Sequence, residues 1–355
     1  MLAGVLTFVV AFAASWGLTV PIRRMALDWG IVDVPNARKI HRTPIPLLGG
    51  LAIYCGTVLA IIGSVDSRAR GQIFGILAAS TLLLIVGILD DRHLLHHQVK
   101  LFVAMPLAAL TLVALGVRTH FASALFPGSA GPILDIGLTL FWVVGITAAY
   151  NIFDHMDGLA SGVTAIASLF FTILALREGQ VLVATLGAAL LGGTLGFLLW
   201  NFNPAKIFMG DGGAMFLGFM VATLGLKLRL DDVPVATSWM IPVLLLIVPI
   251  FDTTLVSISR ARRGLIPFAS PGKDHTAHRL ANTRLGQRGA VLLLYAVGVA
   301  GGLLALLVCG LSVKLALVLA SIVALAALAA VAILERFPYE RQSASESAPG
   351  LRQSH

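Results

Sequence analysis

The sequence predicts an all-α integral membrane protein with about eleven transmembrane helices. Hydrophobic residues make up 58% of the 355 residues and charged residues only 12%, and the mean hydropathy is +0.93. So few polar residues cannot cover a water-soluble globule of 37.3 kDa. Apolar runs near the length that crosses about 30 Å of hydrocarbon as a helix recur along the chain.

Eleven runs have this character, and we expect each to form one span. The first has no basic segment before it and is followed at once by Arg23 and Arg24, so we predict an uncleaved span and not a secretory signal. Only DHMDG divides the fifth run from the sixth. In order, the runs cover roughly residues 2–20, 47–65, 72–89, 101–117, 138–153, 158–176, 180–199, 212–230, 239–259, 290–310 and 314–334.

The loops on one side of the predicted membrane hold 18 of the 25 Lys and Arg residues. By the positive-inside rule this side is cytoplasmic, so the N-terminus faces out and the C-terminus faces the cytoplasm. The net charge of +8 then indicates contact with anionic lipid or phosphate, not with nucleic acid. We expect residues 1–334 to form one polytopic domain and the polar residues 335–355 to form a disordered cytoplasmic tail.

Acidic residues are rare in this chain and gather at span ends. There are only 17 of them, and with the predicted topology several lie together on the cytoplasmic side. Carboxylates gathered at one membrane face of a basic protein predict a divalent metal that handles phosphate. The residues concerned are Asp90, Asp91, Asp154, Asp157 and Asp211, with Asp252 in a secondary position.

Two of these groups follow apolar runs. Asp90 and Asp91 end the third run, where either can face a metal, and a solvated helix terminus is the alternative. Asn151, Asp154 and Asp157 recur every three residues and share one stripe if the helix continues through them. Two carboxylates one turn apart favour a cation between them, and a polar hairpin is the alternative.

The segment NFNPAKIFMGDGG places Asn203, Lys206 and Asp211 beside a glycine cluster that opens the eighth run. Glycines at a free helix N-terminus favour phosphate binding. Asp211 is then either a Mg²⁺ ligand or a simple N-cap.

Two basic loops complete the candidate site. The loop between the ninth and tenth runs holds Lys273, His275, His278 and Arg279, for which we predict contact with an anion, since a zinc site needs more imidazole or thiolate ligands than this loop supplies. The first cytoplasmic loop pairs its own basic side chains with three prolines, which suits either phosphate binding or a topological anchor. Those side chains are Arg38, Lys39 and His41.

Six segments together resemble the polyprenyl-phosphate N-acetylhexosamine-1-phosphate transferases, the WecA/TagO-like enzymes of the MraY superfamily. The resemblance covers roughly residues 33–289 and includes the eleven-span plan with the N-terminus outside. The matching segments, in the family's order, are DVPNARKIHRTPIPLLGG, GILDDR, NIFDHMDGLASG, NFNPAKIFMGDGG, IFDTTLVSISRARRG and SPGKDHTAHRL.

The resemblance implies transfer of a sugar-1-phosphate, GlcNAc-1-phosphate above all, from a UDP-sugar to undecaprenyl or another polyprenyl phosphate. This reaction would release UMP, use Mg²⁺ or Mn²⁺, and initiate an envelope glycan such as lipopolysaccharide, teichoic acid or arabinogalactan at the bacterial inner membrane. It is compatible with a homodimer. The implied roles are catalysis for Asp90 and Asp91, metal binding for Asp211 and Asp154, phosphate binding for Arg38, Lys39 and His41, and donor binding for Asn151, Asp157, Asn203, Lys206, Lys273, His275, His278 and Arg279.

Two departures from the family pattern, Ala148 and His155, lie beside the donor positions. The loop KDHTAHRL is closer to the hexosamine-phosphate branch, which makes an MraY-type muramyl-pentapeptide donor the less favoured alternative. A polytopic transporter with cytoplasmic gating carboxylates is the alternative from another class, but it predicts polar residues along the middle of several spans. An intramembrane aspartyl protease built on Asp211 and Asp252 leaves the other clusters unexplained.

Overall fold

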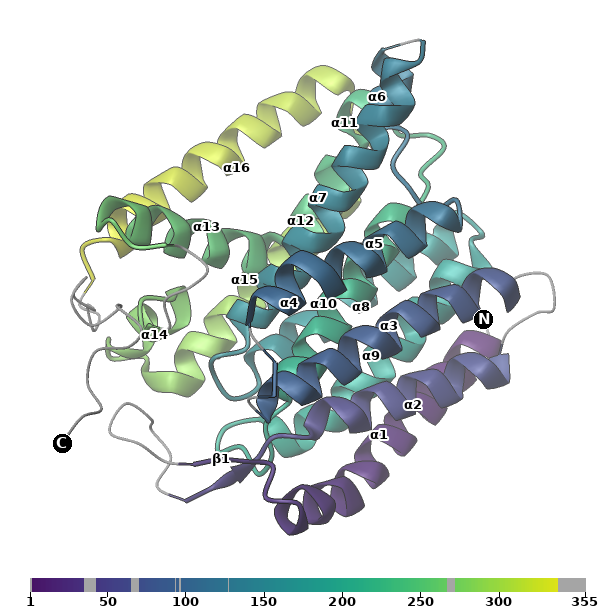
Figure 1. Ribbon diagram of the computed structural model, residues 1–355. Coiled ribbons are helices and arrows are strands. Elements are labelled where there is room, and N and C mark those ends of the chain that lie inside the picture. The colour runs from purple at the N-terminus through teal and green to yellow at the C-terminus, as the bar shows by residue number, and fades with distance from the viewer. Residues whose placement is uncertain are drawn as a thin grey trace.

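The computed structural model describes residues 2–34, 43–64, 70–92, 94–95, 97–126, 128–266 and 272–337, which form a helical bundle with one small β-ribbon (Figure 1). Each of the eleven apolar runs contains helix. The helices are α1 Leu2–Asp28, α2 Gly49–Ser64, α3 Arg70–Asp91, α4 His97–Val99, a π-helical turn Lys100–Ala104, α5 Met105–Ala114, α6 Phe121–Leu125, α7 Ala130–Phe153, α8 Leu159–Arg177, α9 Val181–Asn201, α10 Gly210–Lys227, α11 Val235–Ser238, α12 Met240–Leu245, α13 Ile247–Arg262, α14 Thr276–Ala281, α15 Gly286–Val308 and α16 Val313–Leu334.

The prediction of an all-α membrane protein is confirmed. Within the described ranges, seven helices are long and apolar enough to cross a membrane, or eight if the bent pair α12 and α13 forms one span. Helix α2 and the stretch Lys100–Ala114 are apolar but shorter. The count of eleven spans therefore stays a prediction.

The ninth predicted span is broken. The segment Val235–Leu245, which contains α11 and α12, meets α13 at 81° across Leu246 instead of forming one straight rod with it. Pro249 lies in the first turn of α13, where its missing N–H leaves no hydrogen bond unmade, whereas inside a continuous helix it would remove one. This bend directs α13 toward α14 and the end of α16 (Figure 1).

Glycines bring the backbones of α2, α3 and α10 into direct contact. A Cβ added to Gly50 would lie 2.2 Å from the Cα of Gly213, and one added to Gly87 would lie 2.3 Å from the Cα of Gly212. No side chain fits at either crossing, as is common where transmembrane helices pack closely. The glycine cluster in MGDGG thus serves helix packing, and it places the first turn of α10 against the end of α3.

The β-ribbon holds the first loop against the start of α10. Strand β1, Val32–Asp33, pairs antiparallel with β2, Ile45–Pro46. The Phe208 amide donates to the Pro46 carbonyl at 2.8 Å, and the Gly49 amide donates to the Phe208 carbonyl at 2.9 Å. The predicted phosphate-binding residues Arg38, Lys39 and His41 lie outside the described residues.

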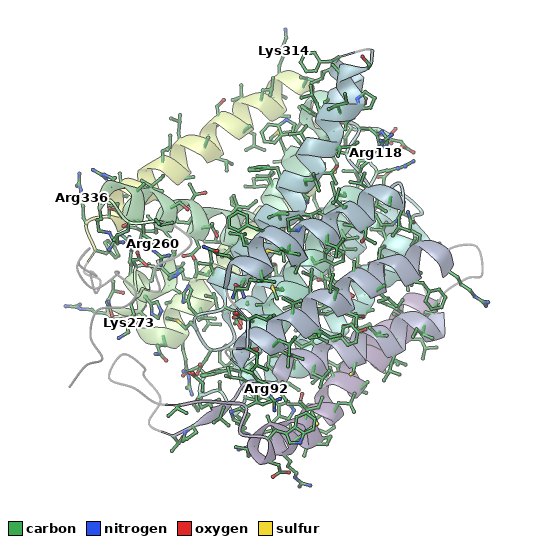
Figure 2. All side chains as sticks on the ribbon, viewed as in Figure 1. Arg92, Arg118, Arg260, Lys273, Lys314 and Arg336 are labelled. Carbon is green, nitrogen blue, oxygen red and sulfur yellow. The ribbon has the colours of Figure 1, made fainter. Side chains whose placement is uncertain are left out.

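Basic side chains mark both ends of the bundle. Figure 2 shows Arg118 and Lys314 at one end, and Arg260, Lys273 and Arg336 toward the other. Helix α16 stands apart from the bundle, with only 6% of its apolar window buried (Figure 1). An apolar helix so little covered by protein is suited to contact with lipid.

We expect Gly87→Ala to destabilise the fold, because the new methyl group meets the backbone of α10 and not a flexible side chain. Overpacking of this kind costs about 1–3 kcal/mol, which should lower the apparent Tm in detergent by a few degrees. Gly71→Ala is the matched control on the same helix, since a Cβ there meets nothing within 4 Å. Equal Tm values for the two variants would contradict the packing described here.

Candidate active site

The N-terminus of α10 is capped by a carboxylate from α3. The Asp211 amide donates to Asp91 at 3.1 Å to Oδ1 and 3.0 Å to Oδ2. A carboxylate at this position satisfies a free amide and faces the positive end of the helix dipole. Gly210, with φ of +75°, allows the approach, because a Cβ there would lie 2.6 Å from Asp91 Oδ2.

This cap corrects two interpretations of the sequence. Asp211 is not its own N-cap, because it lies in the first turn of the helix and the capping carboxylate is that of Asp91. The N-terminus of α10 is also not free for a phosphate, since Asp91 already occupies it. The neighbours Asp90 and Asp91 therefore have different surroundings, although the sequence treats them as a pair.

A lysine lies between the carboxylates of Asp90 and Asp211. Lys100 Nζ lies 2.6 Å from Asp90 Oδ2 and 2.5 Å from Asp211 Oδ2. Lys100 opens a π-helical turn, and the Met105 amide bonds to the Lys100 carbonyl. Pro106 follows this turn and has no N–H to continue the α-helical pattern across it, so the wider turn forms there.

Asp154 belongs to the same neighbourhood. Helix α7 ends at Phe153, so Asn151, Asp154 and Asp157 do not share one continuous helical stripe. Burial, and then the nearby charges of Asp211 and Asp157, raise the pKa of Asp154 to about 7. The Asn151 Nδ2 is buried and makes no hydrogen bond to a described residue, so it remains available to a ligand.

Asp157 and Asn203 mainly hold two loops together. Asp157 Oδ2 accepts from Asn203 Nδ2 and from the Ala205 amide, both at 3.0 Å. Asn203 Nδ2 also donates to Gln287 on α15 at 2.9 Å. The ammonium of Lys206 lies over the Trp200 ring, 5.2 Å from its centroid. Their predicted contact with the donor stays a prediction.

Three histidines gather at the start of α14. His275 Nδ1 lies 2.8 Å from Asp252 Oδ2, and the Thr276 amide donates to Asp252 Oδ1 at 2.7 Å. The His155 ring lies 4.0 Å from that of His275 and 4.6 Å from that of His278, centroid to centroid. The secondary candidate Asp252 thus anchors the histidine loop to α13, and His155 joins the cluster from the loop before α8.

Ligand atoms of His155, Asp252 and His275 lie within 4.8 Å of one another, which is close enough to consider a metal. However, the His155 ring is tilted only 35° from the His275 ring and 30° from the His278 ring. Near-parallel rings do not direct their in-plane lone pairs at one point, as tetrahedral coordination requires. The arrangement fits a stack of imidazole rings better than a metal centre.

Arg279 is fully buried and already bonded to the protein. It donates to the Asp274 carbonyl, to Ser259 Oγ and to the Leu334 carbonyl at 2.8 to 2.9 Å, and it pairs with Glu335. Arg279 therefore connects α14 to α13 and to the end of α16. Its predicted contact with the sugar donor stays a prediction.

Asp274 completes this network. It forms a two-bond ion pair with Arg260, at 3.0 and 2.8 Å, and contacts Arg263. Burial opposes ionisation, but the bonds and charge of Arg260 outweigh it and lower the pKa of Asp274. The segment that carries the histidines is thus fixed by ion pairs on its buried side.

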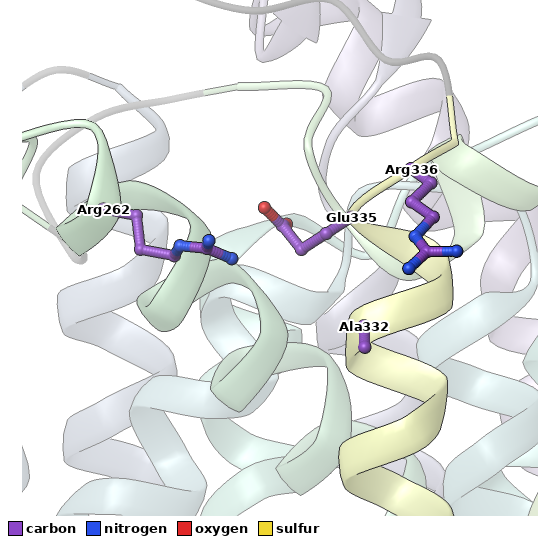
Figure 3. Close-up of a pocket in the computed structure, with 4 residues that line it drawn as sticks. All are labelled: Arg262, Ala332, Glu335 and Arg336. Atoms are coloured by element: carbon purple, nitrogen blue, oxygen red, sulfur yellow. The ribbon is translucent and has the colours of Figure 1, made fainter.

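A hollow of about 420 Å³ opens beside this network, between the ends of α13 and α16 (Figure 3). It is lined by Arg262, Ala332, Glu335 and Arg336. The clustered carboxylates and histidines do not line it. We therefore assign the candidate chemistry to the carboxylate cluster and not to this hollow.

Comparison with known proteins identifies the family of this chain. Residues 73–229 match the model of glycosyl transferase family 4. The chain is 36% identical over 300 residues to the probable undecaprenyl-phosphate N-acetylglucosaminyl 1-phosphate transferase of Bacillus subtilis, covering 84% of this chain and 83% of that protein. It is 34% identical over 322 residues to the decaprenyl-phosphate N-acetylglucosaminephosphotransferase of Mycolicibacterium smegmatis, covering 82% and 77%.

A third relative, the undecaprenyl-phosphate alpha-N-acetylglucosaminyl 1-phosphate transferase of Yersinia pestis, is 29% identical over 295 residues, covering 80% and 78%. The apolar helices are those of a multi-pass membrane protein, and these relatives are polyprenyl-phosphate sugar-phosphate transferases. The chain belongs to glycosyl transferase family 4, together with these transferases. The predicted family is confirmed.

Acid should destabilise the histidine cluster. Burial, followed by the charge of a neighbouring imidazole, lowers the pKa of His155 to about 4 and that of His278 to about 3, from 6.5. Between pH 6.5 and 4 the unfolded chain binds more of these protons, so the free energy of unfolding falls as the pH is lowered. Asp154 has the opposite effect on the free energy of unfolding, because its raised pKa makes the folded protein take up this proton at a higher pH than the unfolded chain does.

We therefore predict that His155→Asn and His278→Asn each flatten the decline of stability below pH 6.5, by up to about one proton per histidine. The measurement is Tm in detergent, by intrinsic tryptophan fluorescence, between pH 4.5 and 7.5. A wild-type slope in both variants would show that these imidazoles are not buried in the neutral form.

Proposed function

We propose that this enzyme transfers N-acetylhexosamine-1-phosphate, with GlcNAc-1-phosphate the favoured group, from a UDP-sugar to polyprenyl phosphate. UMP is the second product, and the lipid product starts an envelope glycan. The convergence of Asp90, Asp154 and Asp211 at one end of the bundle carries the proposal. The names of the relatives supply the acceptor class and the sugar.

The donor set suits Mg²⁺, with Mn²⁺ as a substitute. Mg²⁺ prefers hard oxygen ligands, and the carboxylates of Asp90, Asp154 and Asp211 supply them. Asp91 is bonded to the Asp211 amide through both oxygens, so it serves to hold α10 in place. When bound, the ion would offset the charge of the donor diphosphate and of the departing UMP.

Transfer requires one phosphorus–oxygen bond to form and one to break. An oxygen of the acceptor phosphate attacks the phosphorus that carries the sugar, and the bond from this phosphorus to the UMP oxygen breaks. Both oxygens of Asp91 accept from the Asp211 amide. Asp90 is therefore the better candidate for accepting a proton from the acceptor phosphate, through the carboxylate oxygen that does not hold the metal. We propose direct attack without an aspartyl intermediate.

The proposal places the site at the cytoplasmic face of a bacterial inner membrane, with the N-terminus outside. Basic side chains near the site support this orientation, since Arg260, Lys273 and Arg336 lie toward the same end of the bundle (Figure 2). A nucleotide-sugar donor is water-soluble and negatively charged, so it would be drawn to this end of the protein.

The experiment offers labelled UDP-GlcNAc, UDP-GalNAc and UDP-MurNAc-pentapeptide to purified enzyme with undecaprenyl phosphate and Mg²⁺. We expect a labelled lipid from UDP-GlcNAc that disappears with EDTA and returns with Mg²⁺ or Mn²⁺. Metal-independent product, or no lipid product from any donor, would contradict the proposal. A phosphorylated Asp90 or Asp91 peptide after incubation with donor alone would exclude direct attack.

We predict that Asp211→Asn lowers turnover at least about 100-fold without preventing membrane insertion, because it removes a ligand charge from the site. Asp135→Asn is the matched control. Asp135 is buried in α7 and accepts from the Ala122 and Ser123 amides at the start of α6. About 27 Å of helix separates Asp135 from the end of α7, where Asp154 follows.

Each variant removes one carboxylate charge, buried for Asp135 and partly buried for Asp211, but only Asp211 belongs to the proposed metal site. We expect Asp135→Asn to lower Tm while turnover per folded molecule stays near that of the wild type. Equal loss of turnover in the two variants would assign the effect to folding and remove Asp211 from the metal site.

A further inference from the structure

Lys100 occupies the position between Asp90 and Asp211. Its ammonium contacts Oδ2 of both carboxylates, at 2.6 and 2.5 Å, and its side chain is only 16% exposed. The Asp90 side chain is equally buried at 16%, and that of Asp211 is 31% exposed. Lys100 is not among the site residues predicted from the sequence.

A metal ion and this ammonium cannot both lie between Oδ2 of Asp90 and Oδ2 of Asp211. Mg²⁺ binds carboxylate oxygens at about 2.0–2.1 Å, so an ion between these two oxygen atoms takes the space of Lys100 Nζ. Two cations at such a separation also repel strongly in a partly buried site. Metal binding at this pair therefore requires the ammonium to move.

The lysine side chain is suited to such a movement. Its charge is a compact ammonium on a flexible four-carbon chain, and this ammonium binds phosphate as a point charge without a fixed bonding geometry. The π-helical turn holds the backbone of Lys100 beside the carboxylates. A displaced ammonium consequently stays near the substrate phosphates.

We propose that Lys100 competes with the divalent cation for Asp90 and Asp211, and that the bound cation transfers the Lys100 ammonium to a phosphate of the substrate. The inference rests on the proposed function, because it takes a divalent ion and a phosphate substrate as ligands of this site. Lys100 would thus set the metal affinity of the free enzyme. It would also prevent three carboxylates from facing one another without a cation.

The first test measures Mn²⁺ binding to the full-length protein in detergent, without substrates, by electron paramagnetic resonance. We expect Lys100→Gln to bind Mn²⁺ at least about fivefold more tightly than the wild type. Lys227→Gln is the matched control, because Lys227 bonds to Gln72 at 2.6 Å across the other end of the same helix pair, α10 and α3. Unchanged or weaker binding by Lys100→Gln would overturn the proposal.

The second test uses the wild-type protein and separates displacement from simple charge repulsion. Acetylation of lysines, read by mass spectrometry, should increase at least about threefold at Lys100 when Mg²⁺ is added. It should stay the same at Lys227. If Lys100 is labelled equally or less with Mg²⁺, the ammonium does not leave the carboxylates and the proposal fails.

These readouts do not depend on transferase activity. If the wild-type enzyme makes no lipid product, the proposed function is contradicted. The competition still holds in that case, provided that Lys100→Gln binds Mn²⁺ more tightly and Mg²⁺ increases the labelling of Lys100 in the wild type. Metal-dependent lipid synthesis by a wild-type enzyme that lacks both effects would contradict the competition alone.

Discussion

The backbone contact between α3 and α10 determines the position of the charged groups in the candidate site. Gly87 and Gly212 let the two helices touch without intervening side chains. Only at this separation can Asp91 bond to the first-turn amide of α10. That cap in turn places Asp211 opposite Asp90, with Lys100 between them.

Buried or partly buried aspartates repeatedly hold the start of another helix in this chain. Asp91 caps α10, Asp135 bonds to the first amides of α6, and Asp252 bonds to the first amide of α14. A buried carboxylate is costly unless it is paired or hydrogen-bonded, and a helix N-terminus offers both amides and a favourable dipole. These contacts leave Asp90, Asp154 and Asp211 as the carboxylates best placed for a metal.

Composition and motif order predicted the fold class, the family and most members of the clusters. They predicted less about individual roles, because the partner of a side chain depends on packing that local sequence does not encode. Asp90 and Asp91 are adjacent in sequence, yet only Asp91 meets the start of α10. The stripe through Asn151, Asp154 and Asp157 required the helix to continue through them, and it does not form because α7 ends at Phe153.

Lys100 could have been found from the sequence, since it is a lone cation at the start of an apolar run, ten residues after Asp90. Its position between two carboxylates could not be predicted from the sequence, because that position depends on the π-helical turn before Pro106 and on the crossing of α3 with α10. Likewise, the burial of Arg279 depends on the end of α16, more than fifty residues away in the chain.

The most direct measurement is the anomalous scattering of Mn²⁺ in crystals of the wild-type protein. The predicted result is a peak within coordination distance of the Asp90 and Asp211 carboxylates, with the Lys100 ammonium moved away from both. A peak at His155, Asp252 and His275 instead, or no peak beside Asp211 at saturating Mn²⁺ with Lys100 still bridging the carboxylates, would contradict a metal site at the junction of α3 and α10.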